Sequence, residues 1–157
     1  MEKDIETKAK EHLRSRMEDL KFIYNYSTPK DWDEETWETA NNFGILKDMN
    51  NDEIQDCLLE AASNYGLSFD YVPAETFKDQ KRGYFRYQIS WGGPSEEIRF
   101  YIGYDCEPYK IEFWFLDWFT GHRIELAGEY FEIAENIFQN FADMGMVEYA
   151  YNEAMEK

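Results

Sequence analysis

The sequence predicts a single α+β domain, in which an antiparallel β-meander of three to four strands at about residues 84–126 lies between N-terminal and C-terminal helices. Apolar residues recur with a period near 3.6 at both ends of the chain and with a period of 2 in the middle, where Gly- and Pro-containing turns interrupt them. A length of 157 residues suits one domain with a substantial core. We therefore expect one domain over 1–157, with a helical part (1–66), a sheet (67–127) and C-terminal helices (128–157).

Three N-terminal segments have the apolar spacing of amphipathic helices, at about 3–25, 33–43 and 52–65. In the first helix, acidic residues stand four positions before lysines, which is the order that stabilises a helix. Asn50 or Asn51 is expected to cap the third helix, because a side-chain oxygen there can accept a free backbone N–H. Gly66 is expected to close that helix as the glycine that follows its last turn.

The middle of the chain is expected to form strands, and helical spacing returns after them. Apolar and polar residues alternate in the first two strands, and Gly92–Ser95 forms the turn between these strands. The third strand is apolar on both faces, which predicts an internal position in the sheet. In chain order, the expected strands are residues 84–91, 97–104, 109–119 and 123–126, and the expected helices that follow are 129–142 and 146–155.

The formal net charge of -17 is concentrated in two regions of the chain. Residues 31–80 contain 13 acidic and 2 basic residues, and residues 128–157 contain 7 acidic and 1 basic residue. Direct nucleic-acid binding is not expected, because phosphate neutralisation needs clusters of Lys and Arg. Aromatic residues make up 18% of the chain, a content that argues against a disordered acidic segment.

Cysteine usage and hydropathy indicate the cytoplasm. Cys57 and Cys106 are too few for a disulfide framework and have no metal-ligand spacing. The charged N-terminus has no secretory signal, and no apolar run approaches the length needed to cross a bilayer. We therefore expect a cytoplasmic protein that has no membrane partner.

Two of the expected helices carry carboxylates opposite their apolar stripes, as Asp52, Asp56 and Glu60 do on the third helix. Like charges four residues apart destabilise a helix by about 0.2–0.5 kcal/mol per pair. A helix that keeps such a row despite this cost is therefore expected to use the carboxylates for a function. A solvated surface or adaptation to high salt would explain the same composition. Trp32 and Trp37 lie inside the acidic block at 31–38, where aromatic anchors beside carboxylates would suit docking into a basic groove, but for each tryptophan packing within the protein is the favoured expectation. The residues expected to bind a partner are Asp31, Asp33, Glu34, Glu35, Glu38, Asp52, Asp56, Glu60, Glu132, Glu135 and Asp143.

The sequence offers no motif for catalysis, for a cofactor or for a metal ion. Glu112 and Asp117 lie near Trp114 and Trp118, as in an aromatic cleft for sugar hydrolysis. A separation of five residues, however, puts these carboxylates on opposite faces of a regular strand. We expect one of them to be exposed and the other to lie at a strand end. Neither histidine has a nucleophile or carboxylate at a motif spacing, so a non-enzymatic protein is expected.

The segments Phe85–Phe100 (FRYQISWGGPSEEIRF) and Ile111–Trp118 (IEFWFLDW) resemble a stretch of small uncharacterised phage and plasmid proteins. These residues, within about 85–118, are mostly those of a sheet-forming hairpin, so the resemblance supports a scaffold without assigning an activity. Together with the acidic composition, the chain resembles the DNA-mimic inhibitors of restriction and CRISPR systems. Because those inhibitors are mutually dissimilar in sequence, the resemblance implies no site residues. It implies the host cell cytoplasm as the location if the chain is phage-encoded.

The leading hypothesis is an acidic nucleic-acid mimic, an anti-restriction or anti-CRISPR inhibitor that binds the basic nucleic-acid groove of a nuclease or CRISPR effector. A first alternative is an immunity protein or antitoxin that caps a cationic toxin. A second is an aromatic-lined carbohydrate- or ligand-binding module that uses Trp91, Trp114 and Trp118. The chain has 5 Trp, 12 Tyr and 12 Phe, more aromatic residues than one small core normally needs, which is compatible with a homodimer.

Overall fold

The computed structural model describes residues 4–25 and 29–156 and contains a five-stranded antiparallel sheet with the strand order β1-β2-β3-β4-β5. The α+β fold is confirmed, with slightly more strands than expected. The elements are α1 (Ile5–Asn25), the 3-10 turn η1 (Pro29–Asp31), α2 (Glu34–Asn42), α3 (Asn51–Tyr65), β1 (Ser68–Val72), β2 (Tyr84–Ser90), β3 (Ser95–Ile102), β4 (Pro108–Asp117), β5 (Thr120–Glu125), α4 (Gly128–Asp143) and α5 (Met146–Met155). Residue 3, where the first helix was expected to begin, lies outside the described residues.

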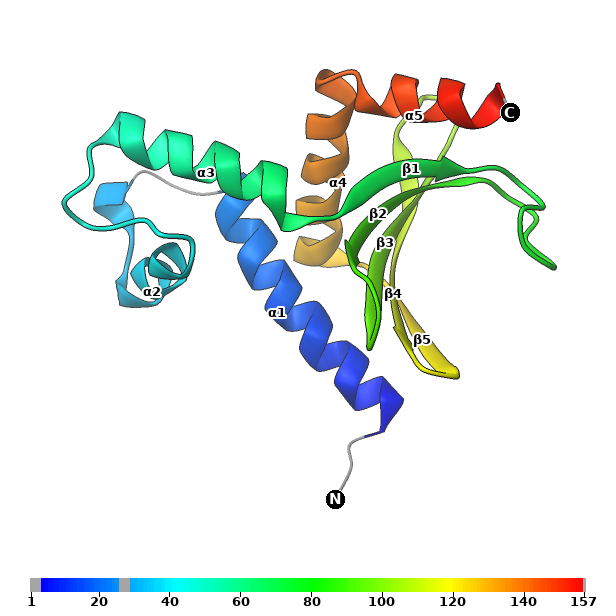
Figure 1. The fold of residues 1–157 in the computed structure, drawn as a ribbon, viewed down its shortest axis with the longest axis horizontal. Helices are drawn as coiled ribbons and strands as arrows, with labels where there is room; N and C mark the ends of the chain where they lie inside the picture. Colours follow the sequence, from blue (N-terminus) through cyan, green and yellow to red (C-terminus); the bar gives the residue numbers. More distant parts are fainter. Residues whose placement is uncertain (1–3, 26–28, 157) are drawn as a thin grey trace.

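The main core lies between the sheet and the helices α1, α4 and α5. Figure 1 shows α1 and α4 against one face of the curved sheet, with α5 along its upper end. Alternate residues of each strand point toward the helices, and their burial there removes apolar surface from water. The core side chains include Leu13, Met17 and Leu20 of α1, Phe85, Phe100, Ile111 and Phe113 of the sheet, and Ile133, Ile137 and Phe138 of α4.

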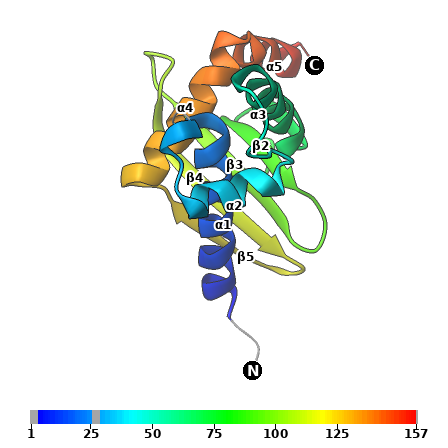
Figure 2. The same cartoon turned by 90° about the vertical axis from the view of Figure 1, so that its left-hand side faces the viewer.

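A second, smaller core joins α2 and α3 to the C-terminal end of α1. Trp32 is 7% exposed there, and Trp37 packs on it edge to face with ring centroids 4.8 Å apart. The expected packing of these two tryptophans is therefore confirmed. Residues 29–65, which we call the acidic lobe, lie on the side of the molecule that faces the viewer in Figure 2. The lobe contains ten acidic and two basic residues.

Local sequence explains where α3 begins, whereas a contact distant in the sequence accounts for the glycine that ends it. The Asn50 side chain accepts a hydrogen bond from the backbone N–H of Glu53, and the Glu53 carboxylate accepts one from the backbone N–H of Asn50. This capping box satisfies two donors that the first turn leaves free. Gly66 ends the helix but adopts an extended conformation, so the expected C-terminal glycine turn was wrong. A Cβ atom at Gly66 would lie 2.1 Å from Cε1 of Tyr87, and the absence of a side chain therefore permits this close contact.

Strand β1 was not among the expected strands. It runs antiparallel to β2, and Arg86 of β2 donates two hydrogen bonds to Asp70 of β1. A five-residue segment is too short to show a clear periodicity by itself. Its pairing partners in β2 lie beyond the following loop, so local sequence does not reveal them.

The boundaries of the last hairpin also differ from those expected. Asp117 pairs with Thr120, so Trp118 and Phe119 form a two-residue turn and do not continue the strand. Trp118 adopts a positive φ of 56° in this turn. Gly121 lies inside β5. The apolar side chains at the turn made the strand look longer, although the pairing register ends it at Asp117.

Candidate functional site

The structure exposes nearly all of the carboxylates that the sequence assigns to partner binding. Of the eleven residues, Glu135 is half-buried and the other ten are exposed. Eight belong to the acidic lobe and three to α4. Within the described residues, none of the eleven carboxylates forms an ion pair with a basic side chain. Their negative charge therefore remains available to a partner.

Local contacts fix two of these carboxylates. Asp33 caps α2 by accepting a hydrogen bond of 2.8 Å from the backbone N–H of Thr36, and this bond lowers the pKa of Asp33. Asp143 accepts a hydrogen bond of 2.9 Å from the Gln139 amide. Neither contact neutralises the charge. Both side chains therefore serve a structural purpose and still contribute to the acidic surface.

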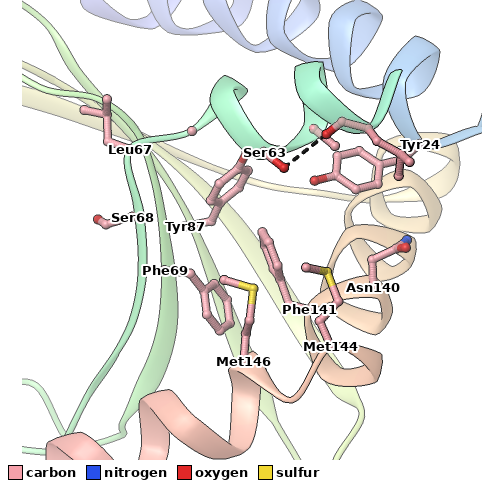
Figure 3. A pocket seen from close by; sticks show the side chains of 13 residues that line it. Tyr24, Ser63, Leu67, Ser68, Phe69, Tyr87, Asn140, Phe141, Met144 and Met146 are labelled. Atoms are coloured by element: carbon pink, nitrogen blue, oxygen red, sulfur yellow. Dashed lines mark hydrogen bonds between the residues drawn. The ribbon is translucent and has the colours of Figure 1, made fainter. Parts of the chain in front are cut away.

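An apolar pocket of about 390 Å³ lies between α3 and the C-terminal end of α4 (Figure 3). Leu59 and Met144 stand at the pocket, with exposed fractions of 58% and 70%. The lining residues are Tyr24, Leu59, Ala62, Ser63, Gly66, Leu67, Ser68, Phe69, Tyr87, Asn140, Phe141, Met144 and Met146. Sequence reasoning missed this pocket, because its walls come from α1, α3, the sheet and the α4–α5 turn.

The pocket connects the two acidic regions of the chain. Residues three or four apart on a helix are neighbours, so Glu60 stands next to Ser63 on one wall. Asp143 stands in the same way next to Asn140 on the opposite wall, and both Ser63 and Asn140 line the pocket. No acidic side chain among the described residues lines the pocket itself, but Glu60 follows the lining residue Leu59 in the chain and Asp143 precedes the lining residue Met144. Glu132 and Glu135 lie two to three turns further along α4.

The expectation for the sheet carboxylates was wrong in one respect. Glu112 is only 3% exposed, although it lies on the sheet face that the helices leave uncovered. Its Oε1 atom accepts a hydrogen bond of 3.1 Å from the Trp114 indole, and Nζ of Lys110 lies 3.5 Å from Oε2. Asp117 lies at the strand end, 3.7 Å from Nζ of Lys8 in α1. Glu112 and Asp117 therefore do not form a carboxylate pair.

The three tryptophans of the ligand-binding alternative occupy different environments. Trp114 lies on the uncovered face of the sheet, where the Arg99 guanidinium stands 3.7 Å from its ring centroid. Trp91 and Trp118 are 74% and 86% exposed and belong to the turns of the β2–β3 and β4–β5 hairpins. The structure does not place these two side chains in the lining of a cleft with Trp114.

A buried carboxylate at Glu96 joins α1 to the sheet. Its two oxygens contact His12 Nδ1 at 2.9 Å, Arg16 at 2.6 Å and the Ser90 hydroxyl at 2.7 Å. Burial opposes the charged form, but the hydrogen bonds from Arg16, Ser90 and His12 outweigh it and lower the pKa of Glu96. The serine donates to the carboxylate and not to the imidazole, so the geometry does not activate a nucleophile. The cluster therefore stabilises the packing of α1 against the sheet through these buried hydrogen bonds.

Comparison of the chain with known protein families, characterised proteins and solved structures finds no match. In the part of the chain that the structure describes, no group of three or more His, Cys, Asp or Glu side chains is arranged to hold a metal ion. None of the helices in residues 4–25 and 29–156 combines the length and the hydrophobicity required to cross a bilayer.

Proposed function

We propose that this chain is a non-enzymatic inhibitor that occupies the basic nucleic-acid groove of a host defence protein, such as a nuclease or a CRISPR effector. The observation that carries the proposal is the set of exposed carboxylates without ion pairs on α2, α3 and α4, which flank an apolar pocket. The carboxylates of such a surface attract a cationic partner over long range, and the pocket can bury one side chain of that partner.

The spacing of the carboxylates supports pooling of charge across helices. Asp52, Asp56 and Glu60 stand about 6 Å apart along the axis of α3, whereas one DNA strand has a phosphate about every 3.4 Å. One row is therefore too sparse to imitate a duplex. The acidic side chains of α2 stand on the same small core as α3, so both helices present charge from one rigid lobe.

The apolar pocket supplies the second part of the proposed interface. An apolar side chain of the partner that entered it would be surrounded by carboxylates, and flanking Lys or Arg residues would pair with them. Methionine is well suited to such a site, because its flexible side chain adapts to different partners. Leu59→Ala and Met144→Ala should therefore weaken binding while they leave the fold intact, since both side chains are largely exposed.

The test uses a purified Cas9-type effector and a purified restriction endonuclease, and measures DNA cleavage and DNA binding. The wild-type chain should inhibit at least one of them in competition with DNA, and its affinity should fall steeply from about 50 mM to about 500 mM NaCl. The variant Asp52→Asn/Asp56→Asn/Glu60→Gln should bind at least about tenfold more weakly. The matched control is Glu148→Gln/Glu153→Gln on α5, which should bind as the wild type does.

Three results would contradict the proposal: no inhibition of either enzyme, an affinity that does not change with salt, or an equal loss of binding in the control variant. A cationic toxin as partner would use the same acidic lobe. It would be recognised by inhibition of a toxin that has no nucleic-acid site, where DNA does not compete.

A further inference from the structure

A cleft of about 750 Å³ lies on the sheet face that the helices leave uncovered. Strands β3, β4 and β5 form its floor, and the β1–β2 loop (73–83), which extends away from the helices in Figure 1, forms a wall. Six of the chain's 16 basic residues line it, against the two acidic residues Asp79 and Glu112. The six are Lys78, Lys81, Arg82, Arg99, Lys110 and Arg123. This cleft is therefore cationic in a protein with a net charge of -17.

Most of these cations have no acidic partner. Arg99 pairs with Glu97 and Lys110 with Glu112, whereas no ion pair within the described residues involves the other four. Acidic residues outnumber basic ones by 33 to 16, so partners are abundant in the chain. Two of these four contact aromatic rings: the Arg82 guanidinium lies 5.7 Å from the Tyr109 ring centroid, and that of Arg123 lies 5.9 Å from the Trp114 ring centroid. Stacking of this kind leaves a positive charge available to an anion.

The cleft is also organised before any ligand binds. The Arg99 guanidinium lies 3.7 Å from the Trp114 ring centroid and 4.5 Å from that of Tyr84, and its Nε donates a hydrogen bond of 2.7 Å to Glu97. The Gln80 amide donates to the carbonyl oxygens of Pro73 and Arg82, which holds the β1–β2 loop together. A preformed arrangement reduces the entropy that binding would otherwise cost.

Uncharged aromatic side chains complete the wall of the cleft. Phe77, Tyr101 and Tyr109 line it. Burial, together with the neighbouring Glu112 carboxylate, raises the pKa of Tyr101 to about 12. Tyr101 therefore stays a neutral phenol at neutral pH and does not repel an anion.

We propose that this cleft binds a small molecule that carries a diphosphate or triphosphate group. Guanidinium groups match phosphate oxygens in geometry and charge. Several charges in one compact group allow the ligand to contact several of these cations at once, and the short-range contacts offset the repulsion by the net negative charge of the protein, which salt screens at longer distances. A nucleic-acid polymer would extend beyond the cleft toward the acidic remainder of the surface, whereas a ligand of nucleotide size fits within it. The inference is independent of the proposed inhibitor function, since the cleft and the acidic lobe share no residue.

The experiment is isothermal titration calorimetry of the full chain with sodium pyrophosphate, ATP and adenosine. Pyrophosphate and ATP should bind, and adenosine should not. Arg82→Gln/Arg123→Gln should weaken binding at least about tenfold, because each change removes one charge that faces the ligand. Both side chains are exposed, and an unchanged melting temperature would verify the fold. The control variant Arg14→Gln/Lys30→Gln removes two exposed cations outside the cleft and should change the affinity less than about twofold.

The relative affinities of ATP and pyrophosphate distinguish a nucleotide ligand from an inorganic diphosphate ligand. Tighter binding of ATP than of pyrophosphate identifies a nucleotide as the ligand, and equal binding identifies the phosphate group alone. The proposal is overturned if neither compound binds at about 5 mM, if adenosine binds as well as ATP, or if a ten-nucleotide single strand binds more tightly than ATP. An equal loss in the control variant also overturns it. The Asp52→Asn/Asp56→Asn/Glu60→Gln variant should retain binding, which separates this site from the inhibitor function.

Discussion

At the scale of single residues, Glu96 shows how this fold tolerates a buried charge. The side chain is 1% exposed, and three different groups donate hydrogen bonds to it. Two of the donors, His12 and Arg16, belong to α1 and lie 84 and 80 residues earlier in the sequence. Removal of the carboxylate charge would leave the half-buried Arg16 guanidinium without an ion-pair partner. An uncompensated buried charge lowers the stability of the fold strongly.

Glu96→Gln should therefore lower the free energy of unfolding at pH 7 by about 3 kcal/mol. The matched control is Glu129→Gln, which removes an exposed carboxylate 3.4 Å from Lys21 and should change stability by less than about 0.5 kcal/mol. Urea denaturation of both variants measures the difference. Equal effects of the two substitutions would show that burial of Glu96 contributes nothing.

The same residue predicts a dependence on pH. Because the pKa of Glu96 is lower in the folded chain than its ordinary value of 4.5, its charge stabilises the fold above that pH, and this stabilisation is lost as the pH falls through the folded value. The difference in unfolding free energy between wild type and Glu96→Gln should thus shrink from pH 7 to about pH 3. A difference that grows on acidification would contradict the assignment.

At the scale of elements, local sequence predicted the helices better than the sheet. The cap of α3 depends on a contact between residues three apart, so the chain alone predicted Asn50 or Asn51, and the structure selects Asn50. Strand β1 and the register of the last hairpin depend on pairing with residues beyond a turn or loop. Gly66 ends α3 as expected, but the reason involves a residue that is distant in the sequence. The Tyr87 ring lies so close that a side chain at position 66 would collide with it.

The capping box of α3 gives a prediction at this scale. Asn50→Ala removes the side chain that accepts the Glu53 N–H and should lower the free energy of unfolding by about 1 kcal/mol. Asn51→Ala, at the next exposed position, is the control and should have an effect below about 0.5 kcal/mol. Thermal unfolding followed by circular dichroism distinguishes the two. A loss in Asn51→Ala as large as in Asn50→Ala would contradict this cap assignment.

At the scale of the whole molecule, the charges are segregated. Carboxylates without ion pairs cover the acidic lobe and part of α4, whereas basic side chains gather on the uncovered face of the sheet. We propose opposite kinds of partner for these two surfaces, a cationic protein for the first and a small anion for the second. Repulsion among the carboxylates opposes the folded state, since few cations in the lobe relieve it.

This repulsion should be measurable. The variant Asp56→Asn removes both like-charge pairs four residues apart, with Asp52 and with Glu60, and leaves the first turn of α3 unchanged, so it should raise the free energy of unfolding by about 0.5–1 kcal/mol at about 10 mM NaCl. The gain should disappear at about 500 mM NaCl, because salt screens exposed charges. Urea midpoints at both salt concentrations check it. A variant that is less stable than wild type at low salt would show that the row does not destabilise the fold.

The sequence by itself determined the α+β class, most helix bounds, the burial of Trp32 and the location of the acidic blocks along the chain. These follow from periodicity, capping and composition, which act over a few residues. The tertiary structure alone decided that Glu112 is buried, that Glu96 links α1 to the sheet, and that α3 and the C-terminal end of α4 line one apolar pocket. It also decided that cations from separate strands and a loop converge on one cleft. Such arrangements require contacts across tens of residues, and strand register and helix packing, not local sequence, set these contacts.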